Sequence, residues 1–254
     1  MGKVAFSIGP FIFYWYGLMI AVAVFTAAVV TWWQCRVYRE SPEIIYDLTM
    51  YGVSAGLLVS RLYYVLVNWP LYKGNLSEVL FVWQGGLSLH GALFGFLAAA
   101  YGCIRLRKLS LRRWGDILTP GMVLGQAIGQ WANFFNQEAF GYPTELPWGI
   151  YIDFALRPSG FEQFDFFHPV FLYASLWNAG LFMVLVIIAL ISRSRGWLKP
   201  GSIFLLYIVL FSAGQLYFEG LRIDTEIVGG VRLAQVVSFI SLTISFPYLF
   251  YINR

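Results

Sequence analysis

The residues 128–141, IGQWANFFNQEAFG, place several carboxamides and a carboxylate at the end of an apolar run. We call them the polar segment, and its polar side chains are Gln130, Asn133, Asn136, Gln137 and Glu138. Carboxamides both donate and accept hydrogen bonds, and a positioned carboxylate can act as a general base. Such groups are costly inside a bilayer, so they indicate either a site or contacts with neighbouring helices.

Gln126, Gln130, Asn133 and Gln137 are spaced by four and three residues, so on a helix they form one stripe. One interpretation is that each amide only binds a neighbouring helix, which contributes about 1 kcal/mol. That interpretation suits any single amide. For the whole stripe, which runs into Glu138, we favour a polar cavity.

Two ionisable residues lie in other apolar runs. His90 lies in WQGGLSLHGALFG, where Gly86 and Gly91 permit close approach, and Arg61 lies in LLVSRLYYVLVNW. A lone histidine is commonly a satisfied core residue, and an arginine near a helix end can extend to the headgroups. If Arg61 is functional, it would bind an anion such as a lipid phosphate.

A third group lies in SAGQLYFEGLRID, where Gln215, Glu219 and Arg222 share one helix face. The alternative is a surface ion pair. In FHPVFLY, the proline after His168 suits a first helical turn, so we expect His168 to begin a helix rather than catalyse.

The composition is that of an integral membrane protein. Of the 254 residues, 59% are hydrophobic and 12% charged, whereas a soluble domain has about 25% charged residues. The net charge of +4 comes from basic residues spread between apolar runs, which argues against a nucleic-acid surface. The N-terminal run has no cleavage pattern, so we expect a retained first helix and not a signal peptide.

We predict an all-α, polytopic membrane helical bundle that forms a single domain, 1–254. Seven apolar runs are long enough to span a bilayer. They lie near 11–33, 46–69, 87–104, 115–136, 168–191, 201–218 and 231–251. The fourth is the weakest, and its Gly121, Gly125 and Gly129 predict a close helix contact.

The distribution of Lys and Arg predicts the orientation. Most of them follow the first, third and fifth runs, so we expect the N-terminus outside and the C-terminus in the cytoplasm. The loop of about 137–167 is then external. Polar residues from several segments gather at the outer side, which indicates one site. They are Tyr16, Arg61, His90, Asn133, Glu138, Glu219 and Arg222.

Cys35 and Cys103 lie near the predicted cytoplasmic helix ends, where thiols stay reduced. With two histidines they form no metal-ligand pattern, so we expect structural cysteines, no metal and no cofactor.

Across nearly its whole length the chain resembles the prolipoprotein diacylglyceryl transferase family of bacterial inner membranes. The matching segments are WYGLMIAVA, SRLYYVLVNW, GGLSLHGALFG, GQAIGQWANFFNQEAFGYPTELPWGI, FHPVFLYASLWN and YFEGLRID followed by VRLAQVVS. The resemblance implies a multi-pass enzyme of the bacterial inner membrane, with an active site that faces the outer leaflet. It moves the diacylglyceryl group of phosphatidylglycerol to the lipobox cysteine thiol of a prolipoprotein signal peptide and releases glycerol phosphate.

The resemblance also implies the roles of residues. A free thiol with a pKa of about 8.5 needs activation, and the departing phosphate needs donors. The implied catalytic residues are His90, as base or proton relay, Glu138 and Glu219. The implied substrate-binding residues are Tyr16, Arg61, Gln130, Asn133, Gly141, Gln215 and Arg222.

The chain departs from the family pattern at several positions. Gly129-Gln130-Trp131-Ala132-Asn133 stands where the family usually has Gly-Arg-x-Gly-Asn. Gln215 also replaces an arginine, Phe211 replaces a common tyrosine, and Ala174 replaces a glutamate. Charge-assisted contacts to phosphate are about twice as strong as neutral ones, so these changes predict impaired transfer.

Two other hypotheses remain at this stage. The first is an inactive relative that binds phospholipid or lipoprotein signal peptides, motivated by Gln130, Gln215 and Phe211. The second is a transporter, which would favour related half-repeats and mid-membrane charges that the sequence does not show.

Overall fold

The computed structural model describes residues 3–9, 11–81, 85–225, 227–228 and 231–254. The chain forms two compact units, Met1–Gln34 with Gly115–Arg254, and Cys35–Trp114. The single domain expected from the sequence stays a prediction.

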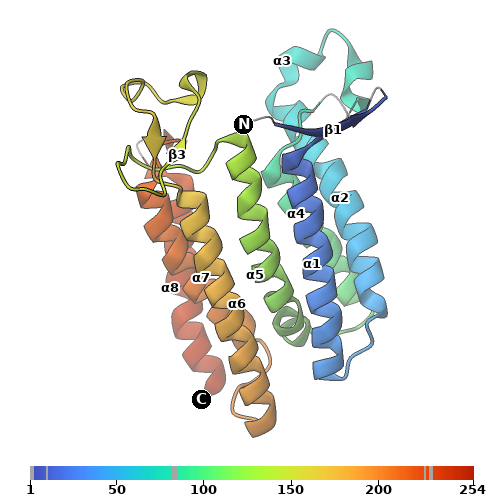
Figure 1. Ribbon diagram of the computed structural model, residues 1–254. Coiled ribbons are helices and arrows are strands. Elements are labelled where there is room, and N and C mark those ends of the chain that lie inside the picture. Colours follow the sequence, from blue (N-terminus) through green and yellow to red (C-terminus); the bar gives the residue numbers. More distant parts are fainter. Residues whose placement is uncertain (1–2, 10, 82–84, 226, 229–230) are drawn as a thin grey trace. The chain divides into compact units, whose positions relative to one another are not determined.

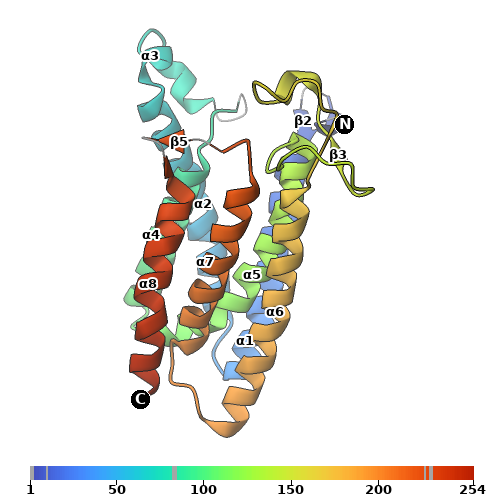
Figure 2. The same ribbon diagram turned by 90° about the vertical axis from the view of Figure 1, so that its left-hand side faces the viewer.

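The first unit is built from long helices (Figure 1). They are α1 (Trp15–Tyr38), α5 (Leu111–Asn136), α6 (Val170–Arg195), α7 (Ser202–Leu221) and α8 (Leu233–Asn253). The last turn of α1 and the first turn of α5 belong to the second unit. Figure 2 shows α7 between α6 and α8. Apolar side chains of α5, α6 and α7 form the core there, namely Val123, Leu181, Leu185 and Tyr207.

Close packing of α1 on α5 depends on glycines. A Cβ added at Gly121 would lie 2.5 Å from the carbonyl oxygen of Ala27, and one at Gly125 would lie 3.0 Å from that of Ala23. These distances leave no room for a side chain at Gly121 and little at Gly125. The predicted close contact is therefore confirmed at these two positions.

Short antiparallel hairpins lie outside the helices. β1 (Val4–Ile8) pairs with β2 (Phe11–Tyr14), β3 (Ile150–Tyr151) with β4 (Phe166–Phe167), and β5 (Ile227–Val228) with β6 (Val231–Arg232). The prediction of a helix from about residue 11 was wrong at its start, because 11–14 form β2. The β-branched and aromatic residues FIFY suit a strand, and Gly9 adopts a φ of 57° in the connection before it.

The second unit pairs α2 (Glu43–Val67) with α4 (Leu89–Leu106). Between them lie the short α3 (Trp69–Tyr72) and a 3₁₀ helix, η1 (Leu76–Leu80). A Cβ added at Gly95 of α4 would lie 2.3 Å from the carbonyl oxygen of Ala55 on α2, so only glycine permits this contact.

Among the described residues, five helices are long and apolar enough to cross a membrane: α1, α2, α6, α7 and α8. The other two predicted spans are also helical. However, α4 is apolar over a shorter stretch, Gly91–Leu106, and α5, although 26 residues long, carries charges and the amide stripe. Thus the positions of all seven predicted segments match helices, while the apolar length is sufficient in five.

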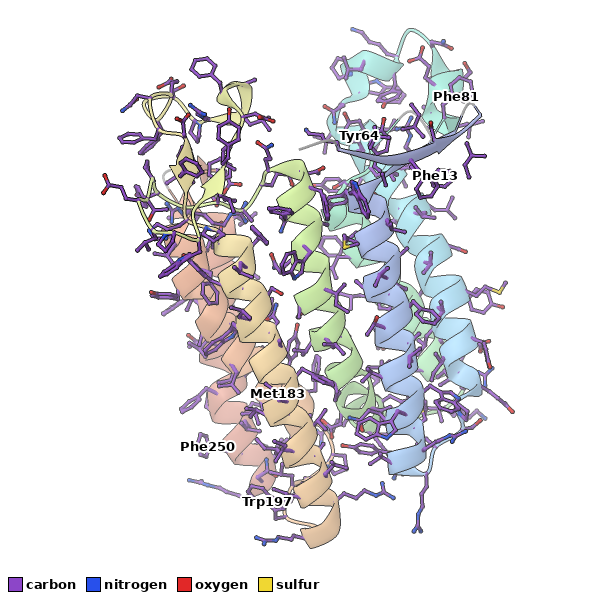
Figure 3. All side chains as sticks on the ribbon, in the orientation of Figure 1. Phe13, Tyr64, Phe81, Met183, Trp197 and Phe250 are labelled. Carbon is purple, nitrogen blue, oxygen red and sulfur yellow. The ribbon has the colours of Figure 1, made fainter. Side chains whose placement is uncertain are left out.

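The outward surface of the helices is apolar. Met183 on α6 and Phe250 on α8 are each 59% exposed, and both are visible in Figure 3. Many other large apolar side chains along these helices are also exposed, including Leu176, Ile187, Phe239 and Ile244. A soluble monomer rarely presents such a continuous apolar surface, so the chain is a multi-pass membrane protein.

Candidate functional site

The polar segment contains a strained stretch of backbone directly after α5. Gln137 and Ala139 have φ angles of 58° and 56°, in the left-handed region. For a residue other than glycine this conformation costs about 1–3 kcal/mol, and it persists only where the surroundings hold it. Strain of this kind clusters at functional sites, so the contacts that hold these two residues define the candidate site.

Asp153 holds Gln137. The side-chain Nε2 of Gln137 donates to Asp153 Oδ2 at 2.8 Å, and the backbone N–H of Asp153 donates to Gln137 Oε1 at 2.6 Å. Asp153 precedes a short 3₁₀ helix, η3 (Phe154–Leu156), in the 137–167 loop. Both ends of the buried Gln137 amide are therefore used to fasten the loop to the end of α5.

Asp224 holds Ala139 from the other side. The backbone N–H of Ala139 donates to Asp224 Oδ2 at 2.6 Å. Beside this contact, the N–H of Ile223 donates to the carbonyl oxygen of Phe140 at 3.3 Å, and Gly141 forms a β-bridge with Arg222. The residues after α7 thus pair with the polar segment along its backbone.

Gly141 is required by close packing. Its added Cβ would lie 2.9 Å from the carbonyl oxygen of Leu221 and 3.0 Å from Val170 Cγ2. Its N–H donates to the carbonyl oxygen of His168 at 2.9 Å. This buried glycine lets the polar segment lie between the end of α7 and the start of α6.

A charged cluster lies at the end of α7. Arg222 Nε donates to Asp224 Oδ1 at 2.9 Å, and Arg222 Nη1 lies 3.5 Å from Oε2 of the buried Glu219. The hydroxyl of Thr225 donates to Glu219 Oε1 at 2.7 Å. Arg232 also donates to the carbonyl oxygen of Glu219.

These acidic neighbours affect the charge of Arg222. Burial lowers the pKa of its guanidinium, but the hydrogen bond and charge of Asp224, with the charges of Glu219 and Glu138, outweigh that effect and raise the pKa. Arg222 is therefore firmly protonated. Its positive charge is also offset by several carboxylates, which reduces its attraction for an added anion.

Tyr16, Gln130, Asn133 and Glu138 complete the part of the predicted site that lies in the first unit. Asn133 Nδ2 donates to Gln130 Oε1 at 3.0 Å, so Gln130 acts here as an acceptor. The exposed Glu138 accepts from Asn136 Nδ2 at 3.2 Å and interacts electrostatically with Tyr16.

The amide stripe divides into two kinds of residue. Gln126 Nε2 donates to the Tyr207 hydroxyl at 2.8 Å, while Gln137 binds Asp153. For Gln126 the alternative interpretation, a contact with a neighbouring helix, is confirmed, whereas Gln137 contacts the 137–167 loop. Gln130 and Asn133 bind each other and remain half-buried.

An aromatic pocket of about 310 Å³ lies next to Gly141. It is lined by Tyr142, His168, Tyr173, Tyr217, Phe218 and Leu221. The Tyr173 hydroxyl accepts from Trp148 Nε1 at 2.9 Å and lies 3.0 Å from His168 Nδ1. Pro169 stands at the N-cap of α6, so His168 does lie where a helix begins.

Arg61 and His90 lie in the second unit. Arg61 is buried at 6% exposure, and its guanidinium donates to backbone carbonyls of the segment before α4. His90 is in the first turn of α4, but its side chain lies outside the described residues.

Besides Gln130 on α5, the positions that depart from the family pattern lie on α6 and α7. Phe211 packs against Tyr207, with ring centroids 5.3 Å apart. Gln215 is half-buried one turn before Glu219, and Ala174 is buried on α6. Apolar packing thus surrounds Phe211, where a tyrosine would add a hydroxyl.

The sequence analysis missed Asp153, Asp224, Thr225 and Arg232 as parts of the site. Asp224 lies two positions after Arg222, and Arg232 is the second residue of VRLAQVVS, so both lie in segments that match the family. The sequence around Asp153 does not indicate its role, because its partner Gln137 is 16 residues away in the sequence.

The cluster has defined chemical capacities. The carboxylates of Glu138 and Glu219 can accept a proton, while Arg222, Arg232 and Asn133 supply hydrogen-bond donors. These groups lie in or just after the last turns of α5 and α7, or at the start of α8, where a polar headgroup can meet an apolar chain.

Comparison with known proteins identifies the family of the chain. The family model described as prolipoprotein diacylglyceryl transferase matches residues 3–251. The chain is 42% identical over 238 residues to a phosphatidylglycerol–prolipoprotein diacylglyceryl transferase of Synechocystis sp., covering 93% of this chain and 84% of the relative. A relative of the same name from Gloeobacter violaceus is 38% identical over 254 residues, covering 100% of this chain and 93% of the relative. The chain therefore belongs to the prolipoprotein diacylglyceryl transferase family.

Proposed function

We propose that this chain transfers the diacylglyceryl group of phosphatidylglycerol to the lipobox cysteine thiol of a prolipoprotein signal peptide. One observation carries the proposal. The strained backbone of the polar segment is held by Asp153 and Asp224, and Asp224 lies beside the pair of Glu219 and Arg222. Family membership supplies the reaction class. The site would face the outer leaflet of the bacterial inner membrane.

The reaction balances without a cofactor. The thiolate sulfur attacks the glycerol carbon that bears the phosphate, a C–S bond forms, and the C–O bond to phosphate breaks. Glycerol phosphate leaves, and the thiol proton passes to a base. The protein must therefore deprotonate the thiol, orient the lipid and stabilise the departing phosphate.

The described residues suit particular steps. Glu138 is exposed and close enough to Arg222 for their charges to interact, which supports our proposal that it accepts a proton or orients a polar headgroup. Buried Glu219 is hydrogen-bonded by Thr225 and paired with Arg222, which suits a fixed negative charge that holds this arginine. We propose Asn133, Gln130 and Tyr16 as ligands of the lipid headgroup, and His90 as the proton relay.

A second function, binding without turnover, is favoured by a specific observation. Arg222 is engaged by Asp224 and Glu219, and Gln130 accepts a hydrogen bond from Asn133. Little positive charge then remains in this part of the site for the phosphate. A relative that binds phospholipid or signal peptide and does not transfer would have this arrangement.

The deciding experiment uses the purified full chain in phosphatidylglycerol vesicles with a synthetic lipobox peptide. Transfer predicts a peptide mass increase by one diacylglyceryl group and an equal amount of glycerol phosphate. Phosphatidylcholine vesicles and a peptide with serine in place of cysteine serve as controls. Peptide binding with no mass change would support the binding function and reject transfer.

A further inference from the structure

The guanidinium of Arg61 on α2 is surrounded by backbone carbonyl oxygens. Its Nε donates to Val79 at 2.9 Å, and its Nη1 donates to Gly85 at 2.7 Å and to Gly86 at 2.9 Å. Its Nη2 donates to Glu78 at 2.6 Å and more weakly to Phe81 at 3.5 Å. The guanidinium also lies 5.2 Å from the ring centroid of Tyr72.

These contacts occupy the hydrogen-bonding capacity of the side chain. An arginine has five N–H groups, and the bonds above use one at Nε, two at Nη1 and two at Nη2. None is left for a phosphate oxygen in this arrangement. The geometry therefore favours a role in holding the described residues between η1 and α4 over the lipid-binding role expected from the sequence.

The glycines of this segment are adapted to Arg61. Gly85 and Gly86 have φ angles of 90° and 74°, which suit only glycine. A Cβ added at Gly86 would lie 2.5 Å from Arg61 Nη1. The backbone can therefore bring two successive carbonyls to one nitrogen only because both residues lack a side chain.

Ser60, which precedes Arg61 on α2, binds Ser88 at the start of α4. Its hydroxyl donates to the carbonyl oxygen of Ser88 at 2.7 Å, and the N–H of Ser88 donates to the carbonyl oxygen of Ser60 at 3.3 Å. Ser88 is the N-cap of α4, and its hydroxyl accepts from the N–H of Gly91. A Cβ added at Gly91 would lie 2.6 Å from the carbonyl oxygen of Val59.

The first turn of α4 is thus fixed to α2 on both sides of His90. Ser88 lies two residues before it, and Gly91 directly follows it. We propose that Ser60 and Arg61 are positioning residues that set the place of the His90 backbone by fixing the start of α4. This inference rests on the proposed function, in which His90 is the proton relay.

The test compares Arg61→Lys and Ser60→Ala with the matched control Arg107→Lys. Lysine keeps the charge of Arg61 but cannot reproduce its planar set of donors. Arg107 pairs with Asp47 near the other end of the same helix pair, and its side chain is 40% exposed. All proteins are studied as full chains in phosphatidylglycerol vesicles.

Two readouts do not depend on turnover. Diethyl pyrocarbonate modification of His90 is measured against His168, which serves as an internal reference in the other unit. Hydrogen exchange is measured over residues 85–95. We expect exchange there to rise about tenfold in Arg61→Lys, the factor for loss of one charge-assisted hydrogen bond, with no change in Arg107→Lys. The His90-to-His168 modification ratio should change in the same variants.

The third readout is transfer. Displacement of His90 predicts that kcat falls about 100-fold while KM for phosphatidylglycerol is unchanged. A raised KM with unchanged exchange over 85–95 would identify Arg61 as a phosphate ligand and overturn the inference. An unchanged modification ratio and unchanged exchange in both variants would also overturn it, as would exchange that rises equally throughout the chain.

The outcomes separate this inference from the proposed function. If the unmodified chain shows no transfer, the proposed function fails, while the modification ratio and hydrogen exchange still decide whether Ser60 and Arg61 fix the start of α4. If Arg61→Lys does not fold, Ser60→Ala decides by the same two readouts.

Discussion

Arg222 and Arg61 were both expected to bind substrate, yet their surroundings differ in kind. Arg222 is held by the carboxylates of Asp224 and Glu219, whereas Arg61 is held by uncharged backbone carbonyls. The carboxylates offset the positive charge of Arg222, whereas the uncharged carbonyl oxygens orient the guanidinium of Arg61 and leave its net charge in place. The comparison shows that the position of an arginine in a motif does not reveal whether its charge remains available.

The backbones around these two arginines differ as well. Near Arg61, the left-handed positions are Gly85 and Gly86, which adopt them without strain. Near Arg222, the left-handed positions are Gln137 and Ala139, which must be held by other groups. The backbone near Arg61 is therefore unstrained because glycine adopts it freely, whereas the backbone near Arg222 is strained at the proposed site.

The largest expected effect comes from adding positive charge at Gln130 and Gln215, two positions where the family usually has arginine. The double variant Gln130→Arg with Gln215→Arg should raise the rate of transfer by about 10²–10³-fold, because each new donor can stabilise the departing phosphate. The rate is measured by peptide mass spectrometry. The control is Gln163→Arg, which adds a charge at an exposed loop position. If the control raised the rate of transfer equally, the gain would come from the net charge of the protein and not from the positions of the new arginines.

Asp224→Ala tests the carboxylate that links Arg222 to the polar segment. It leaves the N–H of Ala139 without its acceptor, so we expect a loss of about 1–3 kcal/mol in unfolding free energy and a large fall in transfer. Unfolding in mild detergent gives the unfolding free energy.

Asp165→Ala is the matched control, because Asp165 pairs with Arg157 but is 62% exposed. Its loss should cost below about 1 kcal/mol. Similar losses in both variants would contradict a special role for Asp224.

Gly141→Ala tests the close backbone pairing in the same region. The added methyl would meet Leu221 and Val170 at 2.9 and 3.0 Å, so we expect a destabilisation of about 1–3 kcal/mol, measured as a lowered Tm. Gly180→Ala on α6 has open space at its Cβ and should stabilise the helix by about 0.5–1 kcal/mol. A Gly141→Ala protein as stable as the unmodified chain would show that the contact can relax.

The smallest effect is expected from Ala139→Gly. Glycine relieves the left-handed strain but raises the entropy of the unfolded chain, so the two effects offset each other and any net loss should be well below the cost of about 1 kcal/mol for glycine in an ordinary helix. Ala189→Gly, at a buried position within α6, should instead cost about 1 kcal/mol. Equal losses in the two variants would remove the argument that residue 139 is strained.

Much of the fold was predictable because apolar runs longer than a bilayer must be helical. The seven expected segments coincide with α1, α2, α4, α5, α6, α7 and α8. The family motifs also led to Glu138, Gly141, Glu219 and Arg222, which the structure brings together. Their roles in catalysis and binding stay predictions.

The remaining features depend on partners that are distant in sequence. The sequence around Arg61 does not indicate that carbonyls of residues 78–81 and 85–86 will surround it, since that depends on how α2 packs against the residues that follow it. The strain at Gln137 and Ala139 likewise becomes evident only once Asp153 and Asp224 are in place. Residue type alone would have favoured ordinary backbone at both positions.

The contact between Ala139 and Asp224 also has a consequence for synthesis of the protein. The two residues are 85 positions apart, so at ordinary translation rates about 4 to 17 s pass between their addition to the growing chain. During that interval α5 can enter the bilayer, but the turn after it has no acceptor from Asp224 to hold its left-handed backbone. The site is therefore completed only after α7 has been made, late in the biogenesis of the molecule.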